Sequence, residues 1–546
     1  MATEIELKYL LLNNEEQATM EQVNSTISLL LNNHALNFSY QQKALKNRYF
    51  DTPNLTLRQH RIALRSRATK HGNSECFEQT IKTSGKVIAG LHQRPEYNVE
   101  LDNNDPILSL FPESIWRKGT DVNTLQQDIV ELFSTNFTRH TWLITLANAQ
   151  VELAFDSGNI ACKGFDSKPS IYEIELELVK GDTKALFFVM KILFSKLALR
   201  PGQQTKAARG YALFHQSQKQ VNSTESQSIN LCEASTKLTR RVKNEAIEPV
   251  SLLTMPLDKN MTLNEAFKAG VSFSLTQLQL KIDSYVEAPS LNTLSKISEI
   301  LALLRQGFWL FAKSLSDENT KLRSELSYFI RTIHWVDNAR YIQALINKQS
   351  TYQKEASVNQ QVITKLQLAN KRYPCESQIL SLFHSERFNN LQLALLALLL
   401  QEEVLNSDNG ITEQELVDLA CSQLILSRKL LSNELVNFPR LGSLGSSEYY
   451  FTAHSLLIRA LLTTSWFSPL FVGQGSDTIK KFSMPWLDIK LGISELQSLD
   501  LLQQQLTHLT EPEPKLSDWL KTKIDNLIAA LEQSQAKALS IKPYWS

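Results

Sequence analysis

The sequence has almost no excess of charge of either sign and very little cysteine. Its 57 lysines and arginines nearly balance 56 aspartates and glutamates, which leaves a net charge of +1. This balance argues against a protein that holds nucleic acid mainly through bulk positive charge. The five cysteines are scattered through 546 residues without CxxC spacing. That pattern argues against a zinc knuckle or a disulfide framework and is typical of a reducing compartment.

Long hydrophobic runs are also missing. The longest apolar run, Leu391–Leu400, lies between polar residues and is well short of the roughly 20 residues that a membrane-spanning helix needs. The N-terminal residues do not show a basic segment followed by an apolar one, which would mark a secretory signal. A GxxxxGKS/T phosphate loop is absent as well, so a P-loop nucleotide hydrolase is not supported. We therefore predict a cytoplasmic protein without a membrane or nucleic-acid partner, and leave its oligomeric state open.

A chain of this length is too long for one hydrophobic core and is expected to hold two or more domains. Residues 1–212 are predicted to be rich in strands, because short runs of alternating apolar and polar residues recur between turn signals; one helix is expected near Glu15–Asn33. Residues 213–260 are predicted to be a linker, since Ser217–Ala234 is rich in Ser, Gln and Asn and lacks periodicity. From 261 to 546 the period becomes helical. The expected helices are Leu294–Leu315, Asn338–Gln349, Ser377–Val404, Thr412–Leu431, Ala453–Leu462 and Asp518–Ala536.

Charged residues alternate along several of the predicted strands, which places each set on one face of its strand. Glu4, Glu6 and Lys8 alternate at the N-terminus, and similar sets recur downstream. These are Arg65 and Arg67; Glu78, Thr80 and Lys82; Arg94, Glu96, Asn98 and Glu100; Glu152 and Asp156; and Glu173, Glu175 and Glu177. For a single strand the simplest interpretation is the solvated face of a sheet. About six such strands, carrying both signs of charge, favour a barrel with a charged interior and an apolar exterior covered by helices.

Such an interior has a chemical use. Carboxylates that face one another raise one another's pKa unless a metal ion lies between them, and oxygen ligands suit Mg²⁺ and Mn²⁺. Facing lysines and arginines repel one another unless an anion lies among them, and arginine binds phosphate oxygens in a bidentate manner. A phosphate-rich small molecule that carries divalent metal satisfies both sets of charges.

These residues resemble the CYTH superfamily, the triphosphate tunnel metalloenzymes. The ExExK motif of the family is present as Glu4-Ile5-Glu6-Leu7-Lys8, and the resemblance continues in order through residues 1–212. It includes YFDTP (49–53), ALRSR (63–67), TIK (80–82), GLHQRPEYNVEL (90–101), LFSTNFTRHTWL (132–143), VELAFDSG (151–158), YEIELEL (172–178) and TKAARGY (205–211). GLHQRPEYNV is similar to the bacterial inorganic triphosphatases whose tunnel domain is joined to a helical CHAD domain, and LLRQGFWLF (303–311) resembles a CHAD helix.

The resemblance implies an α+β architecture, in which an eight-stranded antiparallel barrel forms a tunnel and is followed by an all-helical, CHAD-like domain. It also implies hydrolysis of tripolyphosphate to pyrophosphate and phosphate by water that a divalent metal, Mg²⁺ or Mn²⁺, activates. The implied metal ligands are Glu4, Glu6, Asp156, Glu173 and Glu175, with Glu177 as a further candidate. The implied phosphate-binding residues are Lys8, Arg65, Arg67, Lys82, Arg94, Arg139 and Lys206. Lys8, Lys206 and Glu6 are the expected catalytic residues, and Glu96 and Arg209 are further candidates for the site.

Two positions depart from the family pattern: Arg61 stands where the family often has glycine, and Asn98 stands where other branches carry another acid. Two alternative functions remain open. The first is a class IV adenylyl cyclase or an organic triphosphatase that acts on thiamine triphosphate or nucleotides, because the tunnel motif is shared. The second is a polyphosphate-binding protein that acts through the helical domain. Its local basic residues are Arg305, Lys313, Lys321, Arg323, Arg331 and Arg340, although a solvated helix face is the favoured interpretation of them.

Overall fold

The computed structural model describes residues 2–12, 19–71, 74–88, 90–227, 252–347, 360–405, 414–436, 446–474, 476–506 and 514–545. The chain divides into two compact units. The first comprises Met1–Asn244 together with Ser381–Leu393, and the second comprises Glu245–Leu380 together with Ala394–Ser546. The first unit holds the strands, and the second is built from helices.

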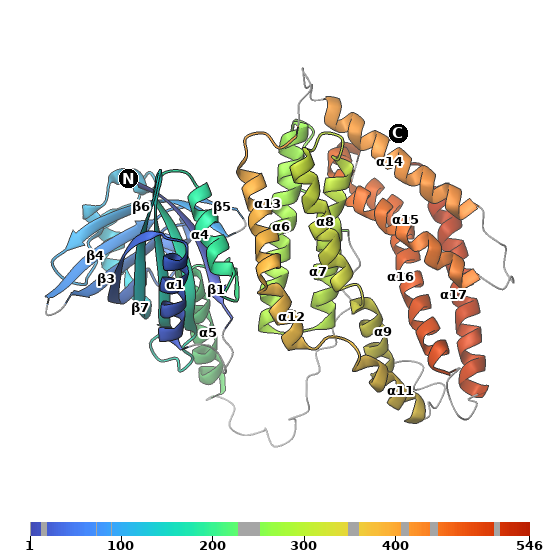
Figure 1. The fold of residues 1–546 in the computed structure, drawn as a ribbon, viewed down its shortest axis with the longest axis horizontal. Coiled ribbons are helices and arrows are strands. Elements are labelled where there is room, and N and C mark those ends of the chain that lie inside the picture. Colours follow the sequence, from blue (N-terminus) through green and yellow to red (C-terminus); the bar gives the residue numbers. More distant parts are fainter. Residues whose placement is uncertain are drawn as a thin grey trace. The chain divides into compact units, whose positions relative to one another are not determined.

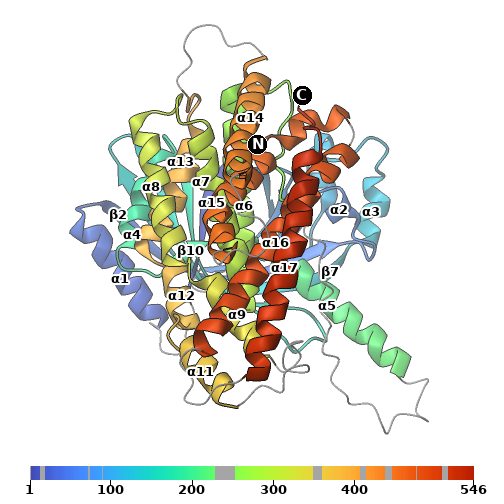
Figure 2. The same ribbon diagram turned by 90° about the vertical axis from the view of Figure 1, so that its right-hand side faces the viewer.

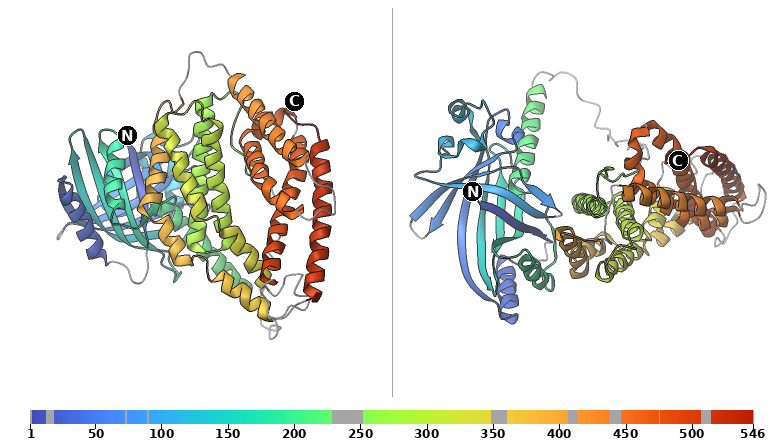
Figure 3. Two further views of the ribbon diagram at one scale, coloured as in Figure 1. Left: turned by 45° about the vertical axis from the view of Figure 1, so that its right-hand side comes forward. Right: turned by 90° about the horizontal axis from the view of Figure 1, so that it is seen from above.

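The strands of the first unit form a closed antiparallel barrel (Figure 3). They are β1 Ala2–Leu11, β2 Asn37–Asp51, β3 Ala63–His71, β4 Ser74–Lys82, β5 Lys86–Ile88, β6 Leu91–Leu101, β7 Val130–Leu146, β8 Ala149–Ala161, β9 Ser170–Lys180 and β10 Leu199–Pro201. Eight of them follow one another in the order β1-β9-β8-β7-β2-β3-β4-β6, and the pairing of β6 with β1 closes the ring. The short strands β5 and β10 extend the edges of β6 and β1. The predicted eight-stranded barrel is confirmed.

Helices cover the outside of the barrel, as the apolar outer faces of its strands require. They are α1 Met20–Asn33, α2 Thr56–Gln59, α3 Val122–Asp128, α4 Lys184–Phe194 and α5 Lys206–Gln227, with short 3-10 turns at Leu108–Leu110 and Glu113–Ile115. Tyr9 of β1 packs edge-on against Phe194 of α4 with ring centroids 5.2 Å apart, and Trp142 of β7 donates its indole N–H to Ser28 of α1. Helices α1 and α4 therefore shield β1, β7, β8 and β9 (Figure 1).

Three local predictions for this unit need correction. The helix expected near Glu15–Asn33 begins at Met20, where Thr19 and Gln22 form a capping box; residues 15–18 lie outside the described residues. The predicted linker begins too early, because α5 continues to Gln227. Its glutamines, serines and lysines extend a helix that starts in the barrel, although they show no apolar period. The predictions also missed α4, whose KALFFVMKILF is a short, mostly apolar segment that buries Leu186, Val189, Met190 and Leu193.

Arg61 adopts the left-handed backbone conformation, with φ of 60°, in the turn between α2 and β3. Glycine adopts this backbone conformation without strain, whereas a residue with a side chain, such as Arg61, loses on the order of 1 kcal/mol of folding stability. We expect Arg61→Gly to raise the free energy of unfolding by about this amount, measured by urea denaturation. His60, with φ of −84°, provides the control, because His60→Gly should lower stability. Equal losses in both variants would contradict the argument.

The second unit consists of helices, as predicted, although their limits differ. They are α6 Leu263–Glu287, α7 Leu291–Leu310, α8 Asp317–Thr332, α9 Val336–Ile346, α11 Gln360–Asn370, α12 Glu376–Phe383, α13 Glu386–Leu400, α14 Gln414–Val436, α15 Ser446–Phe467, α16 Ser476–Leu506 and α17 Pro514–Ser540, with a 3-10 segment at Ser468–Gln474. Part of α12 and α13 groups with the first unit. The single helix predicted over Ser377–Val404 is two helices, and the one predicted to reach Leu315 ends at Leu310.

The sequence predictions did not identify α6, α8, α11 or α16. Helix α8 is dominated by polar residues, and the apolar residues of α16 do not keep to one face. Helices α16 and α17 run side by side (Figure 2). The core of the unit includes Trp466, whose ring lies against Gly270 and Gly307 and whose indole N–H donates to the carbonyl of Leu303. Across the described ranges, none of the helices combines the length and the apolar character that crossing a membrane requires.

Candidate active site

Strand register brings the alternating charged residues together inside the barrel. In the pairing of β1 with β9, Lys8 lies opposite Glu175 and Glu6 lies opposite Glu177. In the pairing of β1 with β6, Glu4 lies opposite Arg94. The side chains of Leu7 and Tyr9 point to the other face of β1 and are buried there. The two-residue period of the strand thus separates a charged interior from an apolar exterior.

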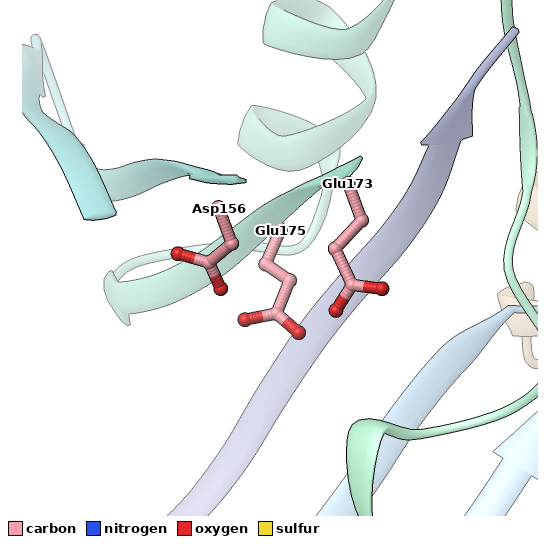
Figure 4. A group of neighbouring side chains, drawn as sticks. All are labelled: Asp156, Glu173 and Glu175. Atoms are coloured by element: carbon pink, nitrogen blue, oxygen red, sulfur yellow. The ribbon is translucent and has the colours of Figure 1, made fainter. Parts of the chain in front are cut away.

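Three carboxylates, which we call the acid triad, form the most buried part of this interior. They belong to Asp156 on β8 and to Glu173 and Glu175 on β9, and one oxygen of each lies within 4.8 Å of the others. Figure 4 shows the three side chains extending toward the same space. Asp156 and Glu173 are completely shielded from solvent. Carboxylates buried in this way require cationic partners or a metal.

Four basic residues surround the acid triad. Lys206 lies 2.7 Å from Asp156, 2.5 Å from Glu173 and 2.8 Å from Glu175. Arg139 binds both oxygens of Asp156, at 2.7 and 2.6 Å, and also contacts Glu175 at 2.7 Å. Lys8, only 1% exposed, lies 2.6 Å from Glu173. Arg209 completes the group at 3.2 Å from Glu173.

The pKa values follow from this pairing. Burial alone would raise the pKa of Asp156 and Glu175, but the neighbouring cations outweigh it: Arg139 and Lys206 lower the pKa of Asp156, and Lys206, Arg139 and Lys8 lower that of Glu175 well below its usual value. Burial likewise opposes the charge of Lys206, yet the three carboxylates raise its pKa. Asp156 and Glu175 are therefore held in the ionised form, and side chains already supply the acid triad with cationic partners.

Helix α5 supplies two of these cations from its first turn. It packs against β7 and β8, where Tyr211 meets Phe133 edge-on with ring centroids 5.3 Å apart. Gly210 lies directly against the Phe133 ring, so that a larger residue would push the helix away. This close approach places Lys206 and Arg209 among the acids of β8 and β9.

A second set of carboxylates, which we call the Glu4 group, consists of Glu4, Glu6, Glu96 and Glu177. Lys82 lies 2.6 Å from Glu4 and 3.0 Å from Glu96. Two weaker ion pairs join this set, Arg94 with Glu6 at 3.3 Å and Arg65 with Glu96 at 3.6 Å. Within the described part of the chain, Glu177 has no basic partner at ion-pair distance.

The Glu4 group has too little positive charge around it. Burial raises the pKa of Glu4, and although Lys82 opposes the shift, Glu6 and Glu96 add to it. Burial also raises the pKa of Glu177 to about 6, with Glu152 contributing. Glu96 differs from Glu4 and Glu177: Lys82 and Arg65 outweigh its burial and lower its pKa. Carboxylates in this condition favour an additional cation, which distinguishes them from the acid triad.

Some basic residues of the barrel interior, in contrast, lack anionic partners. Burial lowers the pKa of Arg67 to about 9, and repulsion from Arg65 and Arg139 contributes. Its Nε donates to the amide oxygen of Asn47 at 2.8 Å, and no carboxylate of the described residues forms an ion pair with it. The Nε atoms of Arg65 and Arg94 are buried without a hydrogen-bond acceptor in the described structure. Buried donors without acceptors are costly, and an anion would satisfy them.

The structure thus brings the predicted site residues together in the barrel interior, where all of them except Arg67 belong to, or pair with, one of the two carboxylate sets. It adds residues that the sequence patterns did not identify. Asn47 was missed because β2 was not predicted. Asn98, which the sequence did place on the interior face, accepts a hydrogen bond from Thr80 through its amide oxygen at 2.7 Å. Asp51, within the YFDTP motif, has a structural role: it accepts hydrogen bonds from the backbone of α2 and from Tyr211.

The sequence of the barrel unit is similar to known proteins. The CYTH domain model matches residues 2–211. An inorganic triphosphatase from Haemophilus influenzae is 34% identical over 179 residues, which are 32% of this chain and 47% of that protein. The match therefore spans about half the length of this curated relative.

Similar solved structures include a protein from Hippeastrum described as an adenylyl cyclase with a dominant triphosphatase activity. It has 19% identity and a TM-score of 0.27, covering 39% of this chain and 95% of that one. PptA from Streptomyces chartreusis has 13% identity and a TM-score of 0.37, over 52% and 99% of the two chains. The CHAD domain from Ricinus communis has 15% identity and a TM-score of 0.38, over 54% and 97%. At TM-scores below 0.5 these similarities carry no argument about fold or function.

Proposed function

We propose that the barrel unit, whose residues 2–211 match the CYTH domain model, hydrolyses inorganic triphosphate to pyrophosphate and orthophosphate with the help of a divalent metal. The observation that carries the proposal is that the barrel interior lacks anions for some of its basic residues and cations for some of its carboxylates. Arg67, Arg65 and Arg94 have donors without an anion, while Glu4 and Glu177 are carboxylates without enough cations. A polyphosphate bound with Mg²⁺ or Mn²⁺ supplies both kinds of missing charge.

The residues present fit such a metal. Glu4, Glu6 and Glu177 would hold it, because they are oxygen ligands whose charges are insufficiently compensated. The acid triad has four cationic partners of its own, so Asp156, Glu173 and Glu175 would join as ligands once phosphate draws those cations away. When bound, the metal would neutralise phosphate oxygens and lower the pKa of the attacking water.

The basic residues of the barrel would bind and orient the substrate. Arg65, Arg67, Arg94 and Lys82 would contact the phosphate oxygens, exchanging weak or shared internal partners for a multiply charged anion. Lys8 and Lys206 would stabilise the charge that develops as the terminal phosphoryl group leaves the chain. Glu6 would accept the proton that the attacking water loses. Burial strengthens each of these interactions.

A substrate panel tests the proposal. We expect full-length protein with Mg²⁺ or Mn²⁺ to release phosphate from tripolyphosphate at least about tenfold faster than from ATP or thiamine triphosphate, since the charged interior recognises phosphate and nothing else of the substrate. Excess EDTA should abolish the release. A preference for thiamine triphosphate or ATP would overturn the inorganic substrate, and formation of cyclic AMP would favour the adenylyl cyclase alternative.

A specific observation keeps polyphosphate binding by the helical unit as a second candidate. Arg305, Arg323, Arg331 and Arg459 lie close enough for mutual repulsion, which adds to burial in lowering the pKa of Arg305. None of the four forms an ion pair with a carboxylate in the described structure. Arg340, predicted as part of this group, instead pairs with Asp337 at 3.5 Å and donates to Ser295.

Binding of long-chain polyphosphate to full-length protein tests this candidate. We expect the double variant Arg305→Gln, Arg459→Gln to bind about tenfold more weakly at physiological salt, because two charge-assisted contacts are removed. Arg372→Gln, which removes an exposed arginine of the same unit, is the control. Equal affinity of the double variant and the control would exclude the helical unit as the binding site.

A further inference from the structure

His92 lies in the barrel interior, although neither the metal ligands nor the phosphate-binding residues include it. It stands on β6 directly opposite Glu6 of β1 and is only 2% exposed. Its charged neighbours are Arg94, two residues along the same strand, and Lys8, two residues beyond Glu6 on the adjacent strand β1. A buried imidazole among such charges needs partners for both of its ring nitrogens.

The contact with Arg94 determines which nitrogen carries the proton. The Nη2 of Arg94 lies 3.4 Å from Nδ1 of His92. Because a guanidinium group only donates hydrogen bonds, Nδ1 must be the acceptor. In the neutral ring the proton is therefore on Nε2, which makes Nε2 a donor.

That donor has no acceptor. Nε2 of His92 is buried and lacks a hydrogen-bond partner within the described structure. The backbone of Gly202 is near enough to favour a proton on the ring, but no hydrogen bond of normal geometry reaches Nε2. The Nε atoms of Arg94 and Arg65 share this condition, so three buried donors in this part of the barrel are without acceptors.

We propose that His92 is a substrate-contacting residue whose Nε2–H donates a hydrogen bond to a phosphate oxygen of the bound inorganic polyphosphate. The inference rests on the proposed function and adds a neutral donor to the set of lysines and arginines. In the described structure Arg94 is paired with Glu6. When a phosphate group replaces Glu6 as the partner of Arg94, one of its oxygens can also accept a hydrogen bond from Nε2 of His92. A neutral donor contributes direction without further positive charge, which suits a site already crowded with cations.

Two substitutions of His92 in the full-length protein distinguish the roles of its two ring nitrogens. Asparagine places its amide near Nδ1 and loses the donor at Nε2, whereas glutamine can place an amide N–H near Nε2. The dissociation constant for tripolyphosphate is measured by calorimetry in EDTA, where hydrolysis does not interfere, and KM and kcat are measured with Mg²⁺. We expect His92→Asn to weaken binding and raise KM by about 10- to 100-fold, as for a lost hydrogen bond to a charged group. His92→Gln should stay near the wild type.

Thermal melting of both variants controls for a purely structural role. The proposal is supported if His92→Asn loses affinity for tripolyphosphate while both variants keep the melting temperature of the wild type. It is overturned if His92→Asn binds tripolyphosphate as the wild type does, or if the two variants lose affinity equally. Failure of the wild type both to bind tripolyphosphate in EDTA and to hydrolyse it with Mg²⁺ would overturn the proposed function and this inference with it.

Discussion

Replacing Glu4 and Glu6 together by glutamine should lower triphosphatase activity by about a thousandfold, which corresponds to the several kcal/mol that a metal contributes to such a transition state. The fold should persist, because the Glu4 group has an excess of acid and burial already raises the pKa of Glu4. Removing negative charge from a crowded, buried set relieves repulsion. Phosphate release from tripolyphosphate and thermal melting are the two measurements.

The matched control for this double variant is Glu131→Gln. Glu131 also lies on a barrel strand, but it pairs with Arg48 on the outside at 2.7 Å and is 40% exposed. Its replacement should leave activity unchanged. If the double variant retains more than about a tenth of the wild-type activity, Glu4 and Glu6 do not hold an essential metal. Mn²⁺ binding, followed by electron paramagnetic resonance, should weaken in parallel with activity.

Replacing Glu173 by alanine should lower the free energy of unfolding by about 3–5 kcal/mol, because it leaves buried cations without their partner. Glu173 is 0% exposed and contacts Lys8, Lys206 and Arg209. The attraction lost is that of one carboxylate to three cations, in a place where water does not replace it. The urea midpoint of the barrel transition measures the change.

Glu131→Ala provides the comparison for stability, since exposed ion pairs contribute about 0–1 kcal/mol. Glu173→Ala should therefore unfold at a much lower urea concentration than Glu131→Ala. Similar midpoints for the two variants would mean that the acid triad is not held by its cations as the structure shows. Added tripolyphosphate should restore part of the lost stability, because an anion can replace the missing carboxylate as the partner of Lys8 and Lys206.

Local patterns allowed much of this architecture to be predicted. The two-residue period of Glu4, Glu6 and Lys8, and of Glu173, Glu175 and Glu177, assigns these residues to one face of each strand whatever the partner strand is. The recurrence of this pattern predicted the charged barrel, and the helical period of the apolar residues predicted the helical second unit. Helix α4 was missed and the end of α5 was misplaced, because packing against the barrel determines these helices more than intrinsic propensity does.

The sequence by itself determined which side chains face the barrel interior, because the alternation of a strand is a property of neighbouring residues. Only the tertiary structure decided which charges meet. Register places Asp156 beside Glu173 and Glu6 beside Glu177, and the packing of α5 brings Lys206 to the acid triad. One set of acids is thereby neutralised and the other left short of cations, and this difference arises from distances that no local pattern contains.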